Sequence, residues 1–441
     1  MLIVTALAAC AATLQPAQQG QTPTIASLGG ATVSPYAPPT SASVVGGRLL
    51  EITLNVPGQT WQETFVVGVP SNLQFPAPVL TLFHGYGEHP RDTVLSTDLV
   101  DEAMSRGWLV FAPLGAHEFN YGIDYAQENI ERAFEFIGER LPLDLDRIYG
   151  VGFSMGGGAA ASYAARHLDP EGVRFAAIVN HTGTSSLELT YATSGNTDIF
   201  ESSLMFDGSP ADQPFSYRRS STINIDPVSG QLDLDGEMAP NLSHVEVQNW
   251  FALYDPLQDL VQQTEELHDR LLQLGASSSE HRVNSSIHQW ATLDALAVVD
   301  WLSQQTLSEP VPGDVVRTLA DRSGAWHSLE IEQRTTGAFT PVLWSGQPSV
   351  NALYLIDMKN AAAVATDVSH HGLDTTAPIH VITEVLDGQG AELRLEGFTA
   401  PPSAVQYRGN AVPSWSYDSQ TGVVTCTETG STRWGHWIVK P

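Results

Sequence analysis

Basic residues and cysteine are the scarce side chains in this chain of 441 residues. Lys and Arg together number 20 against 49 Asp and Glu, so the formal net charge at pH 7 is −29. Such a negative surface repels the phosphates of nucleic acids, and it lacks the basic cluster that binds anionic lipids. We therefore expect no nucleic-acid partner. The two cysteines, Cys10 and Cys426, are too few for a disulfide framework.

The chain also lacks an apolar run long enough to cross a membrane as a helix. Its most apolar N-terminal stretch, residues 1–10, ends in Leu7-Ala8-Ala9-Cys10, which resembles a bacterial lipobox although no basic residue precedes it. We expect residues 1–10 to be an export signal and a lipid on Cys10 to tether a secreted or envelope-anchored protein. The alternative is an apolar N-terminus without a signal. Residues 11–44 carry no charge, which is typical of a flexible linker.

Strand and helix patterns alternate from residue 45 to residue 305, which predicts a mostly parallel sheet covered by helices. A Pro- and Gly-containing stretch at 306–313 reads as a linker, and short β patterns without a long helix predict a small β-sandwich over 314–441. The predicted strands of the first domain are 49–56, 63–69, 79–83, 108–112, 147–153, 175–180, 247–253 and 281–284, and its clearest helices are 124–141, 257–274 and 290–302.

The sharpest motif directly follows the predicted strand 147–153. It reads Gly152-Phe153-Ser154-Met155-Gly156, and small residues continue it as a helix. A strand–turn–helix context around G-x-S-x-G is typical of a nucleophile elbow, whose tight turn requires nearly side-chain-free residues at both glycine positions. The helix N-terminus favours negative charge beside Ser154. We therefore predict that Ser154 is a nucleophile rather than part of a structural turn.

A second glycine-rich turn ends the predicted strand 79–83, at His84-Gly85-Tyr86-Gly87. Acyl transfer through a serine needs two backbone N–H groups that stabilise a tetrahedral oxyanion. We expect the amides of Tyr86 and Met155 to supply them, with the Tyr86 ring beside the acyl pocket.

The acid and the base are expected on later strand ends, in the order Ser, Asp, His. Asp255 follows the strand 247–253, whereas its competitor Asp259 lies inside the helix 257–274. His288 follows the short strand 281–284, whereas the competitors His268 and His281 lie within a helix and a strand. We therefore predict that Asp255 orients His288, which deprotonates Ser154.

At these motifs residues 45–305 resemble the α/β-hydrolase superfamily, and within it the secreted esterases that include polyhydroxybutyrate depolymerases and feruloyl or acetylxylan esterases. The lead-in Asp144-Leu145-Asp146-Arg147-Ile148-Tyr149 and the run Ser154-Met155-Gly156-Gly157 carry the narrower resemblance. The chain departs from many relatives, because Ile287 stands where they have Gly before the catalytic His and because it has no disulfide framework. The resemblance implies an α/β-hydrolase fold, a serine esterase activity and no cofactor. Candidate substrate contacts are His84, Gly85, His181 and Trp290.

Residues 181–246 are a long connection that is either a lid over the site or a surface excursion with its own core. Asp233-Leu234-Asp235-Gly236-Glu237 offers carboxylates but lacks the spacing of a known calcium loop, and we expect no metal. The C-terminal tryptophans either fill a core, which we favour, or bind polymer. A serine carboxylic-ester hydrolase acting on a small or polymeric neutral ester is therefore expected, with a serine peptidase or a non-catalytic binding protein as alternatives.

Overall fold

The computed structural model describes residues 26–28, 31–36, 46–55, 62–412, 415–427 and 433–441. These residues form two compact units. The first comprises the described residues up to 164 together with 173–235 and 245–307, and the second comprises 165–172, 236–244 and 308–441. The predicted signal 1–10 and its Cys10 lie outside the described residues. No helix in the described ranges has both the length and the apolar character needed to cross a membrane.

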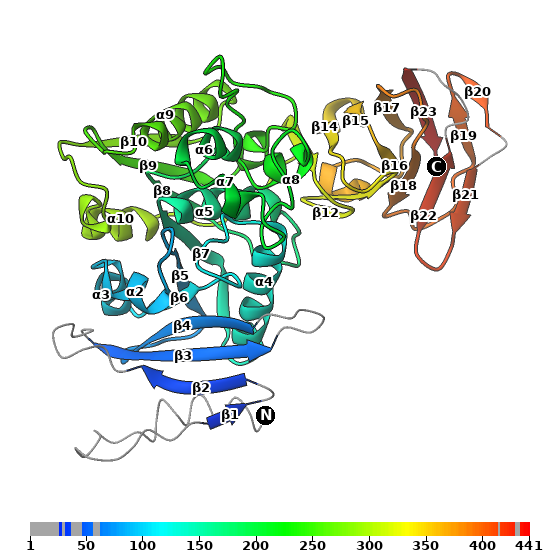
Figure 1. Cartoon of the computed structure of the whole chain (residues 1–441). Helices are drawn as coiled ribbons and strands as arrows, with labels where there is room; N and C mark the ends of the chain where they lie inside the picture. The colour runs from blue at the N-terminus through cyan, green and yellow to red at the C-terminus, as the bar shows by residue number, and fades with distance from the viewer. Residues whose placement is uncertain (1–25, 29–30, 37–45, 56–61, 413–414, 428–432) are drawn as a thin grey trace. The chain divides into compact units, whose positions relative to one another are not determined.

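The first unit is built on a ten-stranded sheet in the order β1-β2-β3-β4-β6-β5-β7-β8-β9-β10 (Figure 1). The pairs β5–β6, β5–β7, β7–β8, β8–β9 and β9–β10 are parallel, and those from β1 to β4 and β4–β6 are antiparallel. The strands are β1 (Ala26–Leu28), β2 (Ala31–Tyr36), β3 (Gly47–Asn55), β4 (Gln62–Pro70), β5 (Ala77–Phe83), β6 (Leu109–Pro113), β7 (Leu143–Phe153), β8 (Ala177–His181), β9 (Glu246–Ala252) and β10 (Ser278–Val283).

Helices cover both faces of this sheet. Buried apolar residues of α2 (Pro90–Leu95), α3 (Leu99–Ser105) and α10 (Ala295–Leu302) share one core with Leu80 and Val151. On the opposite face, Phe134 of α4 (Asp124–Gly138) and Tyr163 of α5 (Met155–Arg166) pack on Phe175. Helix α9 (Gln258–Gln273) packs on β9 and β10. Burial on both faces explains the nearly continuous apolar runs of the central strands.

Two predicted elements differ from those observed. The helix expected at 290–302 is a short 3₁₀ turn, Trp290–Thr292, followed by α10, because Leu293 is extended and Asp294 caps the Ala297 amide at 3.0 Å. Part of the expected linker 11–44 is β1 and β2, and β2 pairs with β3 from Ala31↔Leu54 to Tyr36↔Leu49. Backbone pairing of this kind depends on the neighbouring strand, which linker-like composition does not reveal.

The connection 181–246 is divided between the two units. Residues 181–235 stay with the first unit and contain α6 (Leu187–Ser194), α7 (Thr197–Phe200) and α8 (Pro214–Arg219). Residues 236–244 belong to the second unit, where the 3₁₀ turn η1 (Ala239–Leu242) lies. There the Asn241 side chain donates to the carbonyl of Leu319 at 3.0 Å and accepts its amide at 2.8 Å.

The second unit is a sandwich of a seven-stranded and a six-stranded sheet. Buried residues of both sheets share one core, which contains Trp326, Trp344, Trp437 and Cys426. Three tryptophans are therefore core residues, while Trp434 is 48% exposed. The orders are β11-β14-β15-β17-β23-β19-β20 and β12-β13-β16-β18-β22-β21, with β11 (Val316–Ala320), β12 (Gly324–Trp326), β13 (Leu329–Gln333), β14 (Thr340–Gln347), β15 (Ala352–Met358), β16 (Ala361–Asp367), β17 (Ile379–Val385), β18 (Glu392–Glu396), β19 (Ala404–Tyr407), β20 (Asn410–Ala411), β21 (Trp415–Asp418), β22 (Val423–Thr427) and β23 (Trp434–Lys440).

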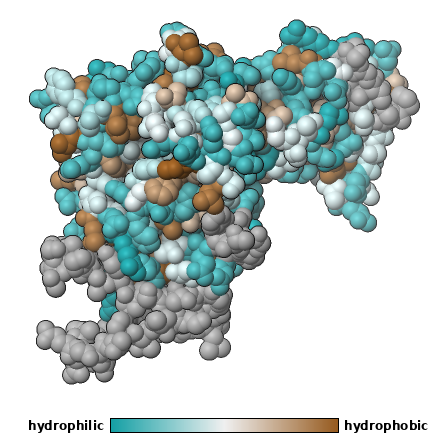
Figure 2. All heavy atoms as spheres, in the orientation of Figure 1, coloured by the Kyte–Doolittle hydropathy of each residue, from teal (hydrophilic) through white to brown (hydrophobic). Residues whose placement is uncertain are grey.

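On the face shown in Figure 2, hydrophobic residues form separate small spots among hydrophilic ones. This distribution is ordinary for a folded protein surface, where isolated apolar side chains need no special explanation.

Candidate active site

Ser154 occupies a sharp turn between a strand and a helix. Strand β7 ends at Phe153 and helix α5 begins at Met155, so Ser154 alone makes the turn. Its φ is 56°, in the left-handed region that a non-glycine residue rarely adopts. The Ser154 amide donates to the carbonyl of His181 at 2.9 Å, which fixes the turn against β8. Ser154 therefore lies at the carboxyl edge of the parallel strands, beside the helix N-terminus.

The two glycines of the motif are required by close backbone approach. A Cβ at position 152 would lie 1.9 Å from the carbonyl oxygen of Gly156, and a Cβ at position 156 would lie 2.2 Å from the carbonyl oxygen of Phe83. Real atoms do not approach so closely, so a larger residue at either position would displace the turn. The structure thus shows the spacing that the motif predicts for a nucleophile elbow.

Asp255 and His288 come together at the carboxyl end of β9. The Asp255 Oδ2 lies 2.8 Å from His288 Nδ1, while Oδ1 accepts the amide of Leu257 at 2.9 Å. Asp255 is only 2% exposed. Since a carboxylate accepts hydrogen bonds, Nδ1 of His288 carries the proton and Nε2 presents its lone pair. Nε2 is buried and has no hydrogen-bond partner among the described residues.

The ring of His288 packs against the last residue of β7, next to Ser154. Its centroid lies 4.5 Å from that of Phe153, the residue immediately before Ser154. The three predicted triad residues are therefore gathered at one edge of the sheet. The competing candidates are engaged elsewhere: Asp259 accepts from Thr193 at 2.8 Å, and His268 contacts Ser278 at 2.8 Å. His281 stacks on Trp250 at 4.2 Å.

The loop expected to hold an oxyanion is fixed on both sides of Tyr86. The Gly85 amide donates to the Glu88 carboxylate at 2.9 Å, and the Gly87 amide donates to the carbonyl of Glu118 at 2.9 Å. The hydrogen bonds of the described residues leave the amides of Tyr86 and Met155 without an acceptor. Both amides are therefore available to a substrate oxygen.

The ring of Tyr86 packs against two aromatic residues of the segment after β6. Its ring centroid lies 4.8 Å from that of Phe119 and 5.9 Å from that of Tyr121. Tyr86 remains 37% exposed, and partial burial raises the pKa of its hydroxyl, so it stays neutral at physiological pH. An exposed neutral ring at this place suits contact with an apolar group.

The four residues expected to contact substrate have little or no exposed surface, and their contact with a substrate stays a prediction. His84 is 3% exposed, Trp290 is 3% exposed, His181 has no exposed surface, and Gly85 is also buried. His84 instead lies between the carbonyls of Gly85 and Leu114, each 2.9 Å from a ring nitrogen. Trp290 donates to Glu88 at 3.3 Å. These residues lie in one packed layer next to Ser154, because folding brings β5, β8 and the segment after β10 together.

His181 lies beside Phe153 and close to His288. Its Nε2 is 2.7 Å from Thr292 Oγ1, and its ring centroid is 4.9 Å from that of Phe153. Burial, reinforced by the neighbouring His288, lowers the pKa of His181 to about 3. The imidazole is therefore neutral, and it packs against Phe153 without placing a positive charge next to His288.

The connection after β8 packs its own aromatic residues against the site. Phe200, Phe206 and Tyr217 form a buried cluster that also contains Tyr121 and Met155. The rings of Phe206 and Tyr217 stack at 4.0 Å. The segment therefore has a core of its own, and that core includes Met155, the residue that follows Ser154. Its role as a lid stays a prediction.

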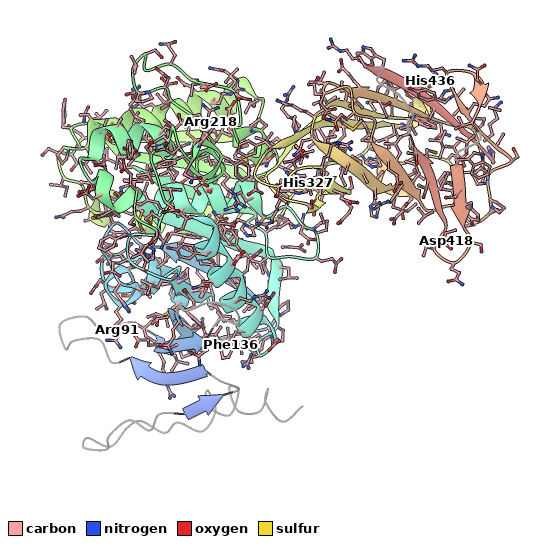
Figure 3. All side chains as sticks on the ribbon, turned by 45° about the vertical axis from the view of Figure 1, so that its right-hand side comes forward. Arg91, Phe136, Arg218, His327, Asp418 and His436 are labelled. Carbon is pink, nitrogen blue, oxygen red and sulfur yellow. The ribbon has the colours of Figure 1, made fainter. Side chains whose placement is uncertain are left out.

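Acidic residues of this connection are neutralised by an arginine. Arg218, labelled in Figure 3, donates to Glu188 at 3.0 Å and to Asp233 at 2.6 Å. Asp233 was the first carboxylate of the faint calcium pattern, and here it pairs with a cation. In the described parts of the chain, no three His, Cys, Asp or Glu side chains are grouped to hold a metal ion.

Three residues that shape the site were not predicted from the sequence. Glu63 of β4 is fully buried, Asn120 is 4% exposed, and Glu88 links the Gly85 amide to Trp290. Glu63 could have been noticed, because it shares a strand face with the apolar Phe65 and interrupts that face with a charge. Asn120 carries no comparable signal.

Comparison with protein families agrees with this architecture. Residues 81–196 match the profile of the α/β hydrolase fold family. Similar solved structures include an S-formylglutathione hydrolase from Agrobacterium tumefaciens, with 15% identity, a TM-score of 0.47, and coverage of 60% of this chain and 97% of that chain. The fluorophosphonate-binding serine hydrolase F of Staphylococcus aureus has 15% identity, a TM-score of 0.43, and coverage of 58% and 98%. Among curated proteins none matches.

The first unit therefore has the α/β-hydrolase fold, as its sheet order, its crossing helices and its strand–turn–helix at Ser154 define it. The second unit is an additional β-rich domain. The site brings together a serine on a strained turn, a histidine oriented by a buried carboxylate, and two unoccupied backbone amides. This arrangement can perform nucleophilic acyl transfer.

Proposed function

We propose that this protein is a serine carboxylic-ester hydrolase that works through an acyl-enzyme. The observation that supports the proposal most is the 2.8 Å contact between Asp255 and His288, whose other ring nitrogen has no partner in the described part of the chain. Ser154, Asp255 and His288 are the nucleophile, orienting acid and base of this proposal.

The reaction follows from these positions. Nε2 of His288 accepts the proton of Ser154 Oγ as that oxygen attacks the ester carbonyl carbon. The resulting oxyanion accepts hydrogen bonds from the amides of Tyr86 and Met155. Collapse expels the alcohol, which receives the proton from His288. Water, deprotonated by His288, then attacks the acyl-enzyme and releases the carboxylic acid.

The substrate is proposed to be a neutral ester. Residues 45–309 hold 12 basic and 36 acidic side chains, a net charge of −24. This field disfavours an anionic substrate and helps to expel the acid product. The exposed Tyr86 ring favours an apolar group near the oxyanion amides. A polyester, a feruloyl ester and an acetylated polysaccharide all fit these conditions.

The test is turnover of p-nitrophenyl acetate and butyrate by the wild type and by Ser154→Ala. We expect the substitution to abolish turnover, and Ser303→Ala, at an exposed helix end, to retain the wild-type rate. A fluorophosphonate should label the peptide that contains Ser154. Equal turnover by wild type and Ser154→Ala would refute the esterase, and cleavage of a peptide p-nitroanilide without ester cleavage would favour a peptidase. Polyhydroxybutyrate, acetylxylan and methyl ferulate then distinguish the ester classes.

Export and attachment through Cys10 form a further part of the proposal, supported by Leu7-Ala8-Ala9-Cys10. Expression in a bacterium should place the protein in the membrane fraction, and Cys10→Ser should release it. The same distribution for both proteins would refute the lipid anchor. Binding of polymer by the second unit is tested with Trp434→Ala, because this ring is 48% exposed. A binding role predicts lost adsorption to polymer with unchanged p-nitrophenyl butyrate turnover.

A further inference from the structure

A buried carboxylate lies where the chain leaves β6 and turns toward the active site. Glu63 of β4 has no exposed surface. The β4–β6 ladder ends with the pair Phe65↔Pro113, so Glu63 lies just beyond it. There the carboxylate accepts three consecutive backbone amides, those of Leu114 at 2.9 Å, Gly115 at 3.0 Å and Ala116 at 2.8 Å. Glu63 therefore fixes the start of the segment 114–122.

The same segment contacts the expected oxyanion loop, residues 84–87, on both sides of Tyr86. The carbonyl of Leu114 accepts from the Asn120 side chain at 2.7 Å and lies 2.9 Å from Nε2 of His84. Nδ1 of His84 lies 2.9 Å from the carbonyl of Gly85. On the far side of Tyr86, the Gly87 amide donates to Glu118 of the same segment at 2.9 Å.

Continuous contacts thus run from Glu63 to both neighbours of Tyr86. Glu63 and the Thr64 carbonyl, which also accepts the Leu114 amide at 3.0 Å, hold Leu114–Ala116 where Leu114 and Glu118 reach His84 and Gly87. The Tyr86 amide has no acceptor of its own among the described residues, so its direction depends on these flanking contacts. A displacement of about 1 Å at such a donor is enough to cost about 100-fold in rate.

We propose that Glu63 is a positioning residue that, through the segment 114–122, aims the Tyr86 amide at the oxyanion of the reaction. This inference rests on the proposed ester hydrolysis. Glutamine cannot replace the carboxylate, because its NH₂ group would face at least one of the backbone N–H donors. One amide would then lose its acceptor, and the segment would shift while its apolar packing stays.

The test compares Glu63→Gln with Glu51→Gln. Glu51 lies in the neighbouring strand β3, is 9% exposed, and pairs with Arg91 of α2 rather than with the segment 114–122. With p-nitrophenyl butyrate, we expect Glu63→Gln to lower kcat at least about tenfold and to leave KM within about twofold. Glu51→Gln should keep the wild-type kcat. A trifluoromethyl ketone, whose hemiketal oxyanion needs the same amides, should lose affinity for Glu63→Gln in proportion to kcat.

Wild-type kcat and ketone affinity in a folded Glu63→Gln protein would overturn the proposal. A higher KM with an unchanged kcat would overturn it as well. If Glu63→Gln does not fold, Asn120→Asp decides, because it removes the donor to the Leu114 carbonyl but leaves the contacts of Glu63. We expect the same kcat-selective loss, and unchanged kinetics would refute the inference.

Failure of the proposed function is a separate result. It would appear as wild-type turnover in Ser154→Ala. In that case the positioning role of Glu63 is tested by the hydrogen-exchange rates of the amides of residues 114–116. Glu63→Gln should raise these rates. Unchanged exchange at these amides would overturn the positioning role.

Discussion

Acid destabilisation through His181 is the prediction that the structure quantifies best. The fully buried imidazole has a pKa of about 3, whereas a histidine in the unfolded chain titrates at about 6.5. Between these values the unfolded state binds a proton that the folded state does not. The stabilising contribution is therefore complete above about pH 6.5 and is lost as the pH falls toward 3. At about 1.4 kcal/mol per pH unit, the loss at about pH 5 is about 2 kcal/mol.

The assay is urea unfolding at about pH 8 and about pH 5, read by hydrogen exchange in β7 and β8 so that only the first unit is followed. Between the two pH values, His181→Gln should lose about 2 kcal/mol less than the wild type. Thr292→Val is the control, because it removes the partner of Nε2 but leaves the imidazole buried. It should lower stability at both pH values and keep the wild-type pH dependence. An identical pH dependence in wild type and His181→Gln would refute the reasoning.

Three further predictions concern the elbow, the triad and the second unit. Gly152→Ala puts a Cβ 1.9 Å from the Gly156 carbonyl oxygen, so kcat should fall at least about 100-fold with a lower Tm, and normal values for both would contradict the steric argument. Asp255→Asn should lower kcat for p-nitrophenyl butyrate by about 10³- to 10⁴-fold while the protein stays folded, because the asparagine cannot hold His288 in the reactive tautomer; a loss below tenfold would exclude the orienting role. Burial raises the pKa of the Cys426 thiol to about 12. Iodoacetamide should therefore alkylate the peptide that contains Cys426 only after denaturation, which mass spectrometry can check. Rapid labelling in the native protein would disprove the buried position.

The sequence alone was sufficient for the architecture of the first unit and for the triad candidates. Because the central strands are buried on both faces, their sequences are nearly continuous apolar runs. The bounds of β7 and β9 were therefore predicted to within a few residues. The steric requirement at the elbow is local, which is why Gly152 and Gly156 identify it. Asp255 and His288 could be chosen because the carboxyl ends of parallel strands meet at one edge, whatever their distance along the chain.

The tertiary structure alone decided which polar residues near the elbow are buried and which remain exposed. His84, His181 and Trp290 look like contact residues by position, yet packing of β5, β8 and the segment after β10 buries all three. The carboxylate of Glu63 reaches its partners because β4 pairs with β6. The three amides that it accepts lie 51 to 53 positions later in the chain. Burial and hydrogen-bond partners depend on how the layers pack. Periodicity and the steric limits of a turn depend on the local sequence. The sequence therefore determined where the chemistry is expected, and the fold determined the contacts around that place.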